Sequence, residues 1–143
     1  DKSLGKDDIF VSRWQNNAFT NPENLGPSIN STGYEFNAFI APDESFLIFT
    51  GYKREDGLGS GDLYISYKNK LDVWGKATSL GSKINSSAMD YCPFYDSLTQ
   101  TLYFTSKRNR ATNQSFLNLE TFLKEINQYE NGSSRIYKCN LKL

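Results

Sequence analysis

Two carboxylates, Glu35 and Asp90, are the residues whose type and spacing could do chemistry together. They lie 55 positions apart, and each directly precedes an aromatic residue. Two carboxylates around one cavity can bind a cation or a basic group, or act as the acid and base of a glycosidase. The alternative is that each accepts hydrogen bonds from a neighbouring loop and joins one repeat to the next. Because a catalytic pair normally breaks the symmetry of a repeat, we favour the structural role.

A glycine-rich loop contains two further candidates for ligand binding, Arg54 and Asp56. Calcium takes about six to eight oxygen ligands from segments of this kind. The spacing of the carboxylates matches no EF-hand loop, and the loop lacks the Gly-Lys-Ser/Thr ending of a phosphate-binding loop. We expect Asp62, like Asp8, to cap backbone N–H groups at the start of a strand instead.

Trp14 is the last candidate ligand contact, because it has no counterpart in the repeat and could stack on a sugar or remain a capped surface aromatic. Trp74, in contrast, aligns with Phe19 and is expected to pack in the core. The chain contains no histidine. A Ser-His-Asp triad, a Cys-His dyad and a histidine-bearing zinc site are therefore excluded within this chain.

The two cysteines, Cys92 and Cys139, match no zinc-ligand pattern. The expected topology places them on strands one and three of one sheet, about 9–10 Å apart. A disulfide needs Cα atoms within about 7 Å, so we expect two buried free thiols. No cofactor and no metal site are predicted.

Composition favours a β-rich domain with no strong electrostatic preference. The 143 residues include 15% aromatic side chains, and Lys+Arg and Asp+Glu are both 16. Aromatic residues favour strands, and the absence of net charge gives no support for a nucleic-acid partner. No apolar run is long enough to span a bilayer, and no signal peptide is visible.

An internal repeat sets the architecture. Leu25–Ser31 returns as Leu80–Ser86 at an offset of 55, which continues without a gap through the next strands. A period of this size without a helical pattern predicts a propeller blade or a β-solenoid turn. The full unit spans residues 35–80, with strands expected at 35–40, 46–50, 62–67 and 74–80. Four strands in about 45 residues fit one propeller blade.

Partial units flank this one. Residues 1–26 match its third and fourth strands, with Asp8–Ser12 aligned to Asp62–Ser66 and Phe19–Leu25 to Trp74–Leu80. Residues 90–143 supply strands at 90–106 and 135–141. Between them, 115–129 has a helical pattern with Ser115 as the expected N-cap and Gly132 as its stop. This helix is expected to cover a sheet edge, or alternatively to act as a lid or to bind a partner.

These motifs resemble the TolB-type, WD-like β-propeller repeat, also called the Pro-Asp repeat. The matching segments, in order, are Glu35-Phe36, Ala41-Pro42-Asp43-Glu44, Leu47-Ile48-Phe49-Thr50, Gly59-Ser60-Gly61-Asp62-Leu63-Tyr64 and Trp74. Glu44 replaces the glycine of the family pattern, Asp96–Gln100 replaces Pro-Asp in the last unit, and Arg135 stands where Asp62 and Asp8 stand. Such departures are expected in a terminal repeat.

The resemblance implies an all-β fold: a partial β-propeller of four-stranded antiparallel blades with one inserted helix. It also implies a periplasmic or extracellular protein of the bacterial cell envelope. We interpret the chain as a non-catalytic binding or scaffolding module for a protein, glycan or other envelope component. The alternative is part of a carbohydrate-active or peptidase-associated propeller enzyme, because propellers carry many activities.

The chain holds about two and a quarter blades, whereas a closed propeller needs roughly four to eight. Either further blades lie outside this sequence, or several chains share one ring as a homo-oligomer joined through open blade edges. In a shared ring, residues 135–141 would compete with Asp8–Ser12 of the next chain for one position. This redundancy favours a truncated chain.

Overall fold

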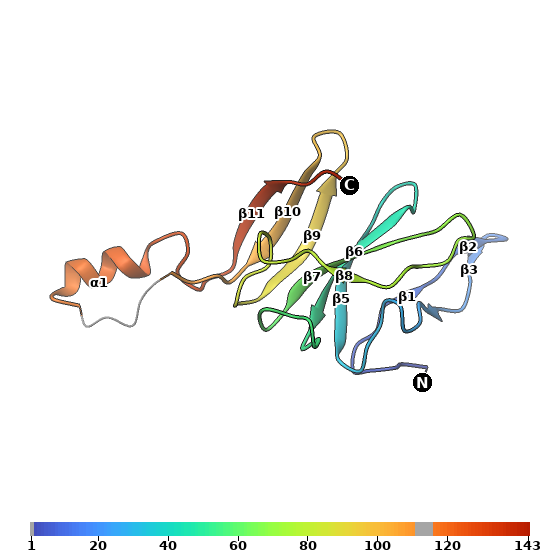
Figure 1. Cartoon of the computed structure of the whole chain (residues 1–143), viewed down its shortest axis with the longest axis horizontal. Helices are drawn as coiled ribbons and strands as arrows, with labels where there is room; N and C mark the ends of the chain where they lie inside the picture. Colours follow the sequence, from blue (N-terminus) through green and yellow to red (C-terminus); the bar gives the residue numbers. More distant parts are fainter. Residues whose placement is uncertain (1, 111–115) are drawn as a thin grey trace.

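The computed structural model describes residues 2–110 and 116–143, and in these residues the chain is mostly β-strand with one helix, α1 (Leu119–Ile126) (Figure 1). The strands are β1 (Phe10–Val11), β2 (Trp14–Gln15), β3 (Ala18–Phe19), β4 (Glu23–Asn24), β5 (Tyr34–Ile40), β6 (Phe46–Tyr52), β7 (Asp62–Tyr67), β8 (Thr78–Ser79), β9 (Asp90–Asp96), β10 (Thr101–Ser106) and β11 (Arg135–Asn140). We call residues 1–26, 35–80 and 90–143 the first, second and third unit.

The second unit is a four-stranded antiparallel sheet in the order β5-β6-β7-β8. Its two central strands are almost completely buried, because both of their faces are covered. The third unit is a three-stranded sheet in the order β11-β10-β9, and the first unit contributes the pair β1-β4. Within the described residues these sheets lie side by side and do not close into a ring (Figure 1).

Each face of the second unit packs against a neighbouring unit. Ile48 and Leu63 lie on the face toward the third unit, in a cluster that includes Leu102 and Phe104. Phe49 and Tyr64 lie on the opposite face, in a cluster against which Ile9 of the first unit packs. The apolar run from Phe46 to Phe49 therefore serves two interfaces, as expected for a strand covered on both faces.

Most expected strands are confirmed, but the fourth strands are shorter than expected. The structure confirms strands over 35–40, 46–50 and 62–67 within β5, β6 and β7. The fourth strand expected over Trp74–Leu80 is only β8, with an isolated bridge from Trp74 to Lys68. The strand expected over Phe19–Leu25 is divided between β3, which pairs with β2, and β4, which pairs with β1. Strands two residues long at an edge have little packing to define them.

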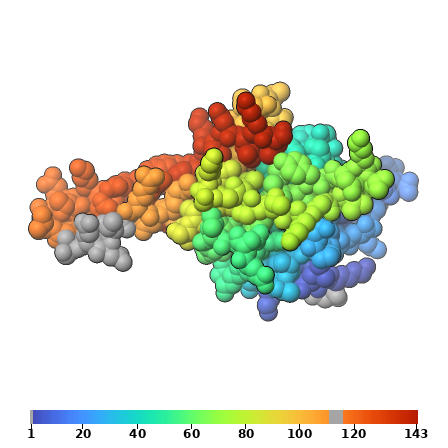
Figure 2. Space-filling view, viewed as in Figure 1, coloured from blue at the N-terminus to red at the C-terminus, as the bar shows by residue number. Residues whose placement is uncertain are grey.

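The helix begins later than predicted. The expected N-cap, Ser115, lies outside the described residues, and the helix is instead capped by Asn118, whose side chain accepts from the Thr121 N–H. It ends at Ile126, well before Gly132. The expectation that it covers a sheet edge is wrong, because it projects away from the sheets (Figures 1 and 2). All its side chains remain at least partly exposed.

Successive units approach closely at two equivalent glycines. A Cβ on Gly5 would lie 2.3 Å from the Ser31 carbonyl oxygen, and one on Gly59 would lie 2.0 Å from that of Ala88. Beside each glycine, a parallel bridge joins the start of one unit's third strand to the next unit's first strand. No side chain larger than hydrogen fits at either position, so the backbones of adjacent units touch.

Among the described residues, no helix has both the length and the apolar character that crossing a membrane requires.

Candidate functional site

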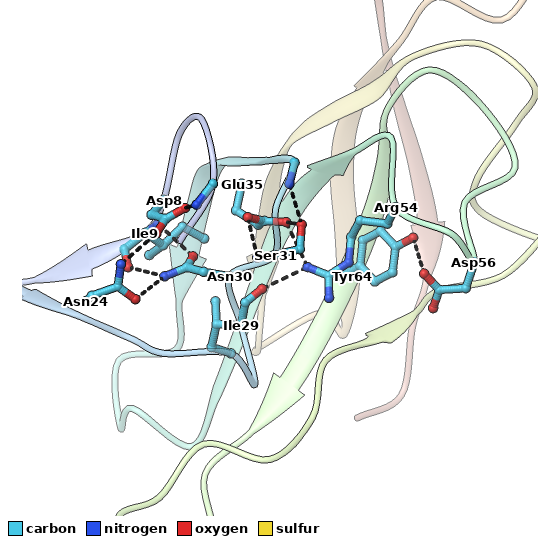
Figure 3. A network of polar contacts seen from close by, with 12 residues as sticks. Asp8, Ile9, Asn24, Ile29, Asn30, Ser31, Glu35, Arg54, Asp56 and Tyr64 are labelled. Carbon is cyan, nitrogen blue, oxygen red and sulfur yellow. Dashed lines mark hydrogen bonds and ion pairs between the residues drawn. The ribbon is translucent and has the colours of Figure 1, made fainter. Parts of the chain in front are cut away.

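Glu35 lies at the junction of the first and second units (Figure 3). Its carboxylate accepts hydrogen bonds from the Ser31 N–H at 2.9 Å and the Ser31 hydroxyl at 2.5 Å. Arg54 adds an ion pair at 3.0 Å and also donates to the Ile29 carbonyl at 2.8 Å. The Glu35 side chain is fully buried. Each carboxylate oxygen is thus held by the connector, the segment Leu25–Ser31 between these units, and Oε1 also by the guanidinium.

Asp90 repeats this arrangement at the junction of the second and third units. It accepts from the Ser86 N–H at 2.5 Å and from the Ser86 hydroxyl at 2.8 Å. Arg108 pairs with it at 3.0 Å and donates to the Ile84 carbonyl at 2.7 Å. The equivalent connector is Leu80–Ser86. The structure therefore brings Glu35 and Asp90 into two separate buried clusters, not into one shared pocket.

Each arginine is also packed on aromatic rings of its own unit. The Arg54 guanidinium lies 4.7 Å from the centre of the Tyr64 ring, and Arg108 lies 4.5 Å from that of Tyr137. A cation over an aromatic face gains electrostatic attraction, more so when water is excluded. The carboxylate on one side and the ring on the other fix the position of the guanidinium.

A second recurring contact ties each connector to the preceding unit. Asn30 accepts from the Ile9 N–H at 2.8 Å and donates to the Ile9 carbonyl at 3.0 Å. Asn85 does the same with Leu63, at 2.8 and 3.0 Å. Each asparagine thus pairs with the third strand of the preceding unit as a strand backbone would. The connectors bind both neighbours, forward through Ser31 or Ser86 and backward through the asparagine.

The expected capping roles of Asp8 and Asp62 are confirmed. Asp62 accepts from the N–H groups of Leu58 and Gly59 at 3.0 and 3.1 Å, and Asp8 accepts equivalently from Leu4 and Gly5. Burial raises the pKa of Asp62. Its second oxygen is buried without a hydrogen-bond partner in the described part of the chain.

Arg54 and Asp56 border an open cavity of about 430 Å³. Asp56 accepts from the Tyr64 hydroxyl at 2.8 Å (Figure 3), and burial is the main cause of the raised pKa of that tyrosine. Lys53 and Lys76 also line the cavity, so charges of both signs surround it. Of the five predicted ligand-binding residues, these are the two that face such a cavity together.

Trp14 lies far from these clusters, on the hairpin β2-β3 at the right of Figure 1. Its ring meets that of Phe19 edge to face at 4.9 Å, and the two side chains are 62% and 70% exposed. Asn16 and Asn17 form the turn with positive φ values, which asparagine tolerates well. Trp74 is partly buried against the core, as predicted.

The cysteines are free, on β9 and β11 with β10 between them, as expected. The prediction that both are buried is wrong, because Cys92 is exposed and Cys139 is only half-buried. The cause for Cys92 is a β-bulge at this residue, whose φ is +50° and whose equivalent in the second unit, Asn37, has the same φ. In the ranges 2–110 and 116–143, no group of three or more Cys, Asp or Glu side chains is arranged to hold a metal.

Sequence reasoning named Arg54 only as a candidate for ligand binding and missed its pairing with Glu35. It also missed Arg108 and the serines and asparagines that complete the clusters. The signal was present, because Asn30-Ser31 returns as Asn85-Ser86 and Lys53-Arg54 returns as Lys107-Arg108. A recurring polar residue inside a repeat indicates a recurring polar partner.

No protein-family model matches the chain, and neither the curated proteins nor the solved structures give a match.

Proposed function

We propose that this chain is part of a TolB-type β-propeller that acts as a non-catalytic binding or scaffolding module for a protein or cell-envelope component, in the periplasm or outside the cell. The observation that carries the proposal is that the recurring carboxylates join units or cap loops, and so serve the scaffold. Glu35 and Asp90 are buried and paired with arginine, and Asp8 and Asp62 cap loops. The repeated residues thus build the scaffold.

Surface features outside this scaffold then carry the recognition. The clearest is the exposed aromatic pair of Trp14 and Phe19, because large rigid aromatic side chains supply much of the energy at binding surfaces. The enzyme alternative requires an acid open to substrate, and the paired carboxylates of Glu35 and Asp90 are closed to it.

The experiment measures cosedimentation of the purified chain with a purified bacterial envelope fraction. We expect saturable binding that falls at least about tenfold when Trp14 and Phe19 are both changed to alanine. Tyr67→Ala, at another exposed aromatic residue, is the matched control and should bind as the wild type does. Equal binding by all three proteins would contradict the role of the hairpin, and no binding would contradict the module's proposed partner class.

A second measurement separates the scaffold from the enzyme alternative. Glu35→Gln should lower stability, with no hydrolysis of glycoside or peptide substrates by either protein. If the variant folds with unchanged stability while a hydrolytic activity of the wild type disappears, the non-catalytic proposal is wrong.

A further inference from the structure

The outer edges of the three equivalent third strands, β1, β7 and β11, are treated differently. In the first unit the edge is covered by β4, and in the second by β8. The strand β11 has no partner on that side within the described residues. The outer face of β11 is open as well: Ile136 is 69% exposed, whereas the equivalent Leu63 of β7, which packs against the third unit, is 0% exposed.

What covers the two occupied edges is chemically the same. The Leu25 N–H donates to the Ile9 carbonyl at 3.2 Å, and the Leu80 N–H donates to the Leu63 carbonyl at 2.9 Å. The asparagine five residues after each leucine then pairs with the N–H and the carbonyl of that same residue. Both occupants are therefore short strands that lead into a turn with the sequence Leu-Gly-x-x-x-Asn.

At β11 a side chain stands in for this segment. The Tyr129 hydroxyl donates to the Ile136 carbonyl, and its ring lies edge to face with Tyr137 at 5.2 Å. Tyr129 is 55% exposed, so this single contact competes with water. The Tyr129 hydroxyl thus donates to the Ile136 carbonyl. In the other units, the equivalent carbonyl accepts from a leucine N–H and from an asparagine side-chain amide.

Charge indicates which kind of segment suits this edge. In the first unit, Val11 of β1 pairs with Glu23 of β4. In the alignment of third strands, Lys138 of β11 stands at the Val11 position, and it is exposed. An acidic residue opposite Lys138 would form a favourable cross-strand pair.

We propose that the outer edge of β11 binds an acidic peptide segment, a short strand that leads into a turn with the sequence Leu-Gly-x-x-x-Asn, and that this segment displaces the Tyr129 hydroxyl from Ile136. Strand addition of this kind obtains affinity from main-chain hydrogen bonds and specificity from the side chains. The inference deepens the proposed function by naming a class of partner. It rests on that proposal only in treating β1, β7 and β11 as the same strand of three equivalent units.

The probe is a fluorescent peptide of residues 20–31, whose own segment covers β1, and the readout is anisotropy on titration with the full chain. We expect saturable binding with a dissociation constant below about 1 mM. The peptide with Asn30→Ala should bind about tenfold more weakly, because two hydrogen bonds are lost. The chain variant Tyr129→Phe should bind the peptide about threefold more tightly, because no hydroxyl competes.

A charge exchange is the sharpest control. Lys138→Glu should weaken binding of the native peptide by up to about fivefold, and a peptide with Glu23→Lys should restore it. Absence of saturable binding, or equal binding by the native and Asn30→Ala peptides, would overturn the proposal. A dimer of the chain that excess peptide leaves intact would also overturn it, because a second copy would then cover the edge. None of these readouts depends on envelope binding or on hydrolysis, so the two proposals fail separately.

Discussion

At the scale of single residues, the stability of the fold depends on buried ion pairs between a carboxylate and an arginine. The Glu35 side chain is 0% exposed and its Arg54 partner 11% exposed, whereas Glu44 is 49% exposed in its pairs with Lys68 and Arg13. Removing one partner from a buried pair leaves an uncompensated charge, while an exposed pair contributes little. The two kinds of pair are thus expected to respond very differently to mutation.

Glu35→Gln and Asp90→Asn should each lower the free energy of unfolding by about 3 kcal/mol, because Arg54 or Arg108 then stays buried without its carboxylate. Urea titration followed by tryptophan fluorescence measures the change. Glu44→Gln is the control and should cost less than about 1 kcal/mol. Losses of similar size in all three variants would show that the buried clusters have no special weight.

The contributions of Asp62 and Asp43 to stability should depend on pH in opposite directions. Burial raises the pKa of Asp62, so its contribution is fully present below pH 3.8 and is lost as the pH rises through the raised pKa. Hydrogen bonds from Ser45 lower the pKa of Asp43, so its contribution is present above pH 3.8 and is lost as the pH falls through the lowered pKa.

Unfolding curves between about pH 3 and pH 7 test this for wild type, Asp62→Asn and Asp43→Asn. With rising pH, the wild type should lose stability relative to Asp62→Asn and gain it relative to Asp43→Asn. Differences that stay constant with pH would contradict both assignments.

At the scale of elements, the bulge that opens β9 imposes a left-handed backbone on a residue poorly suited to it. Asn37 and Cys92 both have φ of +50°, and asparagine adopts this region far more readily than cysteine. Cys92→Asn should therefore raise the free energy of unfolding by about 0.5–1 kcal/mol. The mirror change, Asn37→Cys, should lower it by a similar amount in thermal denaturation. A loss of stability in Cys92→Asn would mean that the thiol makes a contact worth more than the strain.

The helix α1 should be energetically separate from the sheets. Phe122 is 38% exposed and lies on an element with no buried residue. Phe122→Glu should change global stability by less than about 0.5 kcal/mol, whereas Phe104→Ala in the core should cost about 3–5 kcal/mol. Chemical denaturation compares the two variants. A large loss in Phe122→Glu would place the helix against the sheets.

Strand positions could be predicted where the residue pattern and the burial agree. The predictions failed where tertiary contacts determine the length of the strand. The run Phe46–Thr50 is apolar because two neighbouring units cover it, so its pattern was readable. The short β8 is defined by its pairing with Tyr64 and Ile65 of β7, a tertiary contact that no local pattern records. Glu35 and Asp90 stood out by recurrence, but their arginines follow at distances of 19 and 18 residues, beyond any local motif.

At the scale of the whole molecule, the two ends of the array differ. The faces of β6 and β7 toward the third unit are apolar, with Ile65 among them, whereas Lys138 occupies the Ile65 position in β11. Polar residues on the outer face are typical of a terminal repeat, and a basic residue on an edge strand opposes pairing with the same strand of a second copy.

We therefore expect a monomer at micromolar concentrations, measured by light scattering coupled to size exclusion. Lys138→Ile should shift the chain toward dimers, because it restores the apolar face found on the second unit. A stable wild-type dimer or trimer would mean that chains complete one another's sheets.

The glycines at which successive units touch set a limit on how this chain can vary. Gly5 and Gly59 leave no room for even one carbon. The distance between neighbouring sheets is therefore fixed at these two positions. Length can then change only where a loop leaves the stack, as it does between β10 and β11, where the third unit carries its extra helix. New surface can accumulate there without altering the register of the stack.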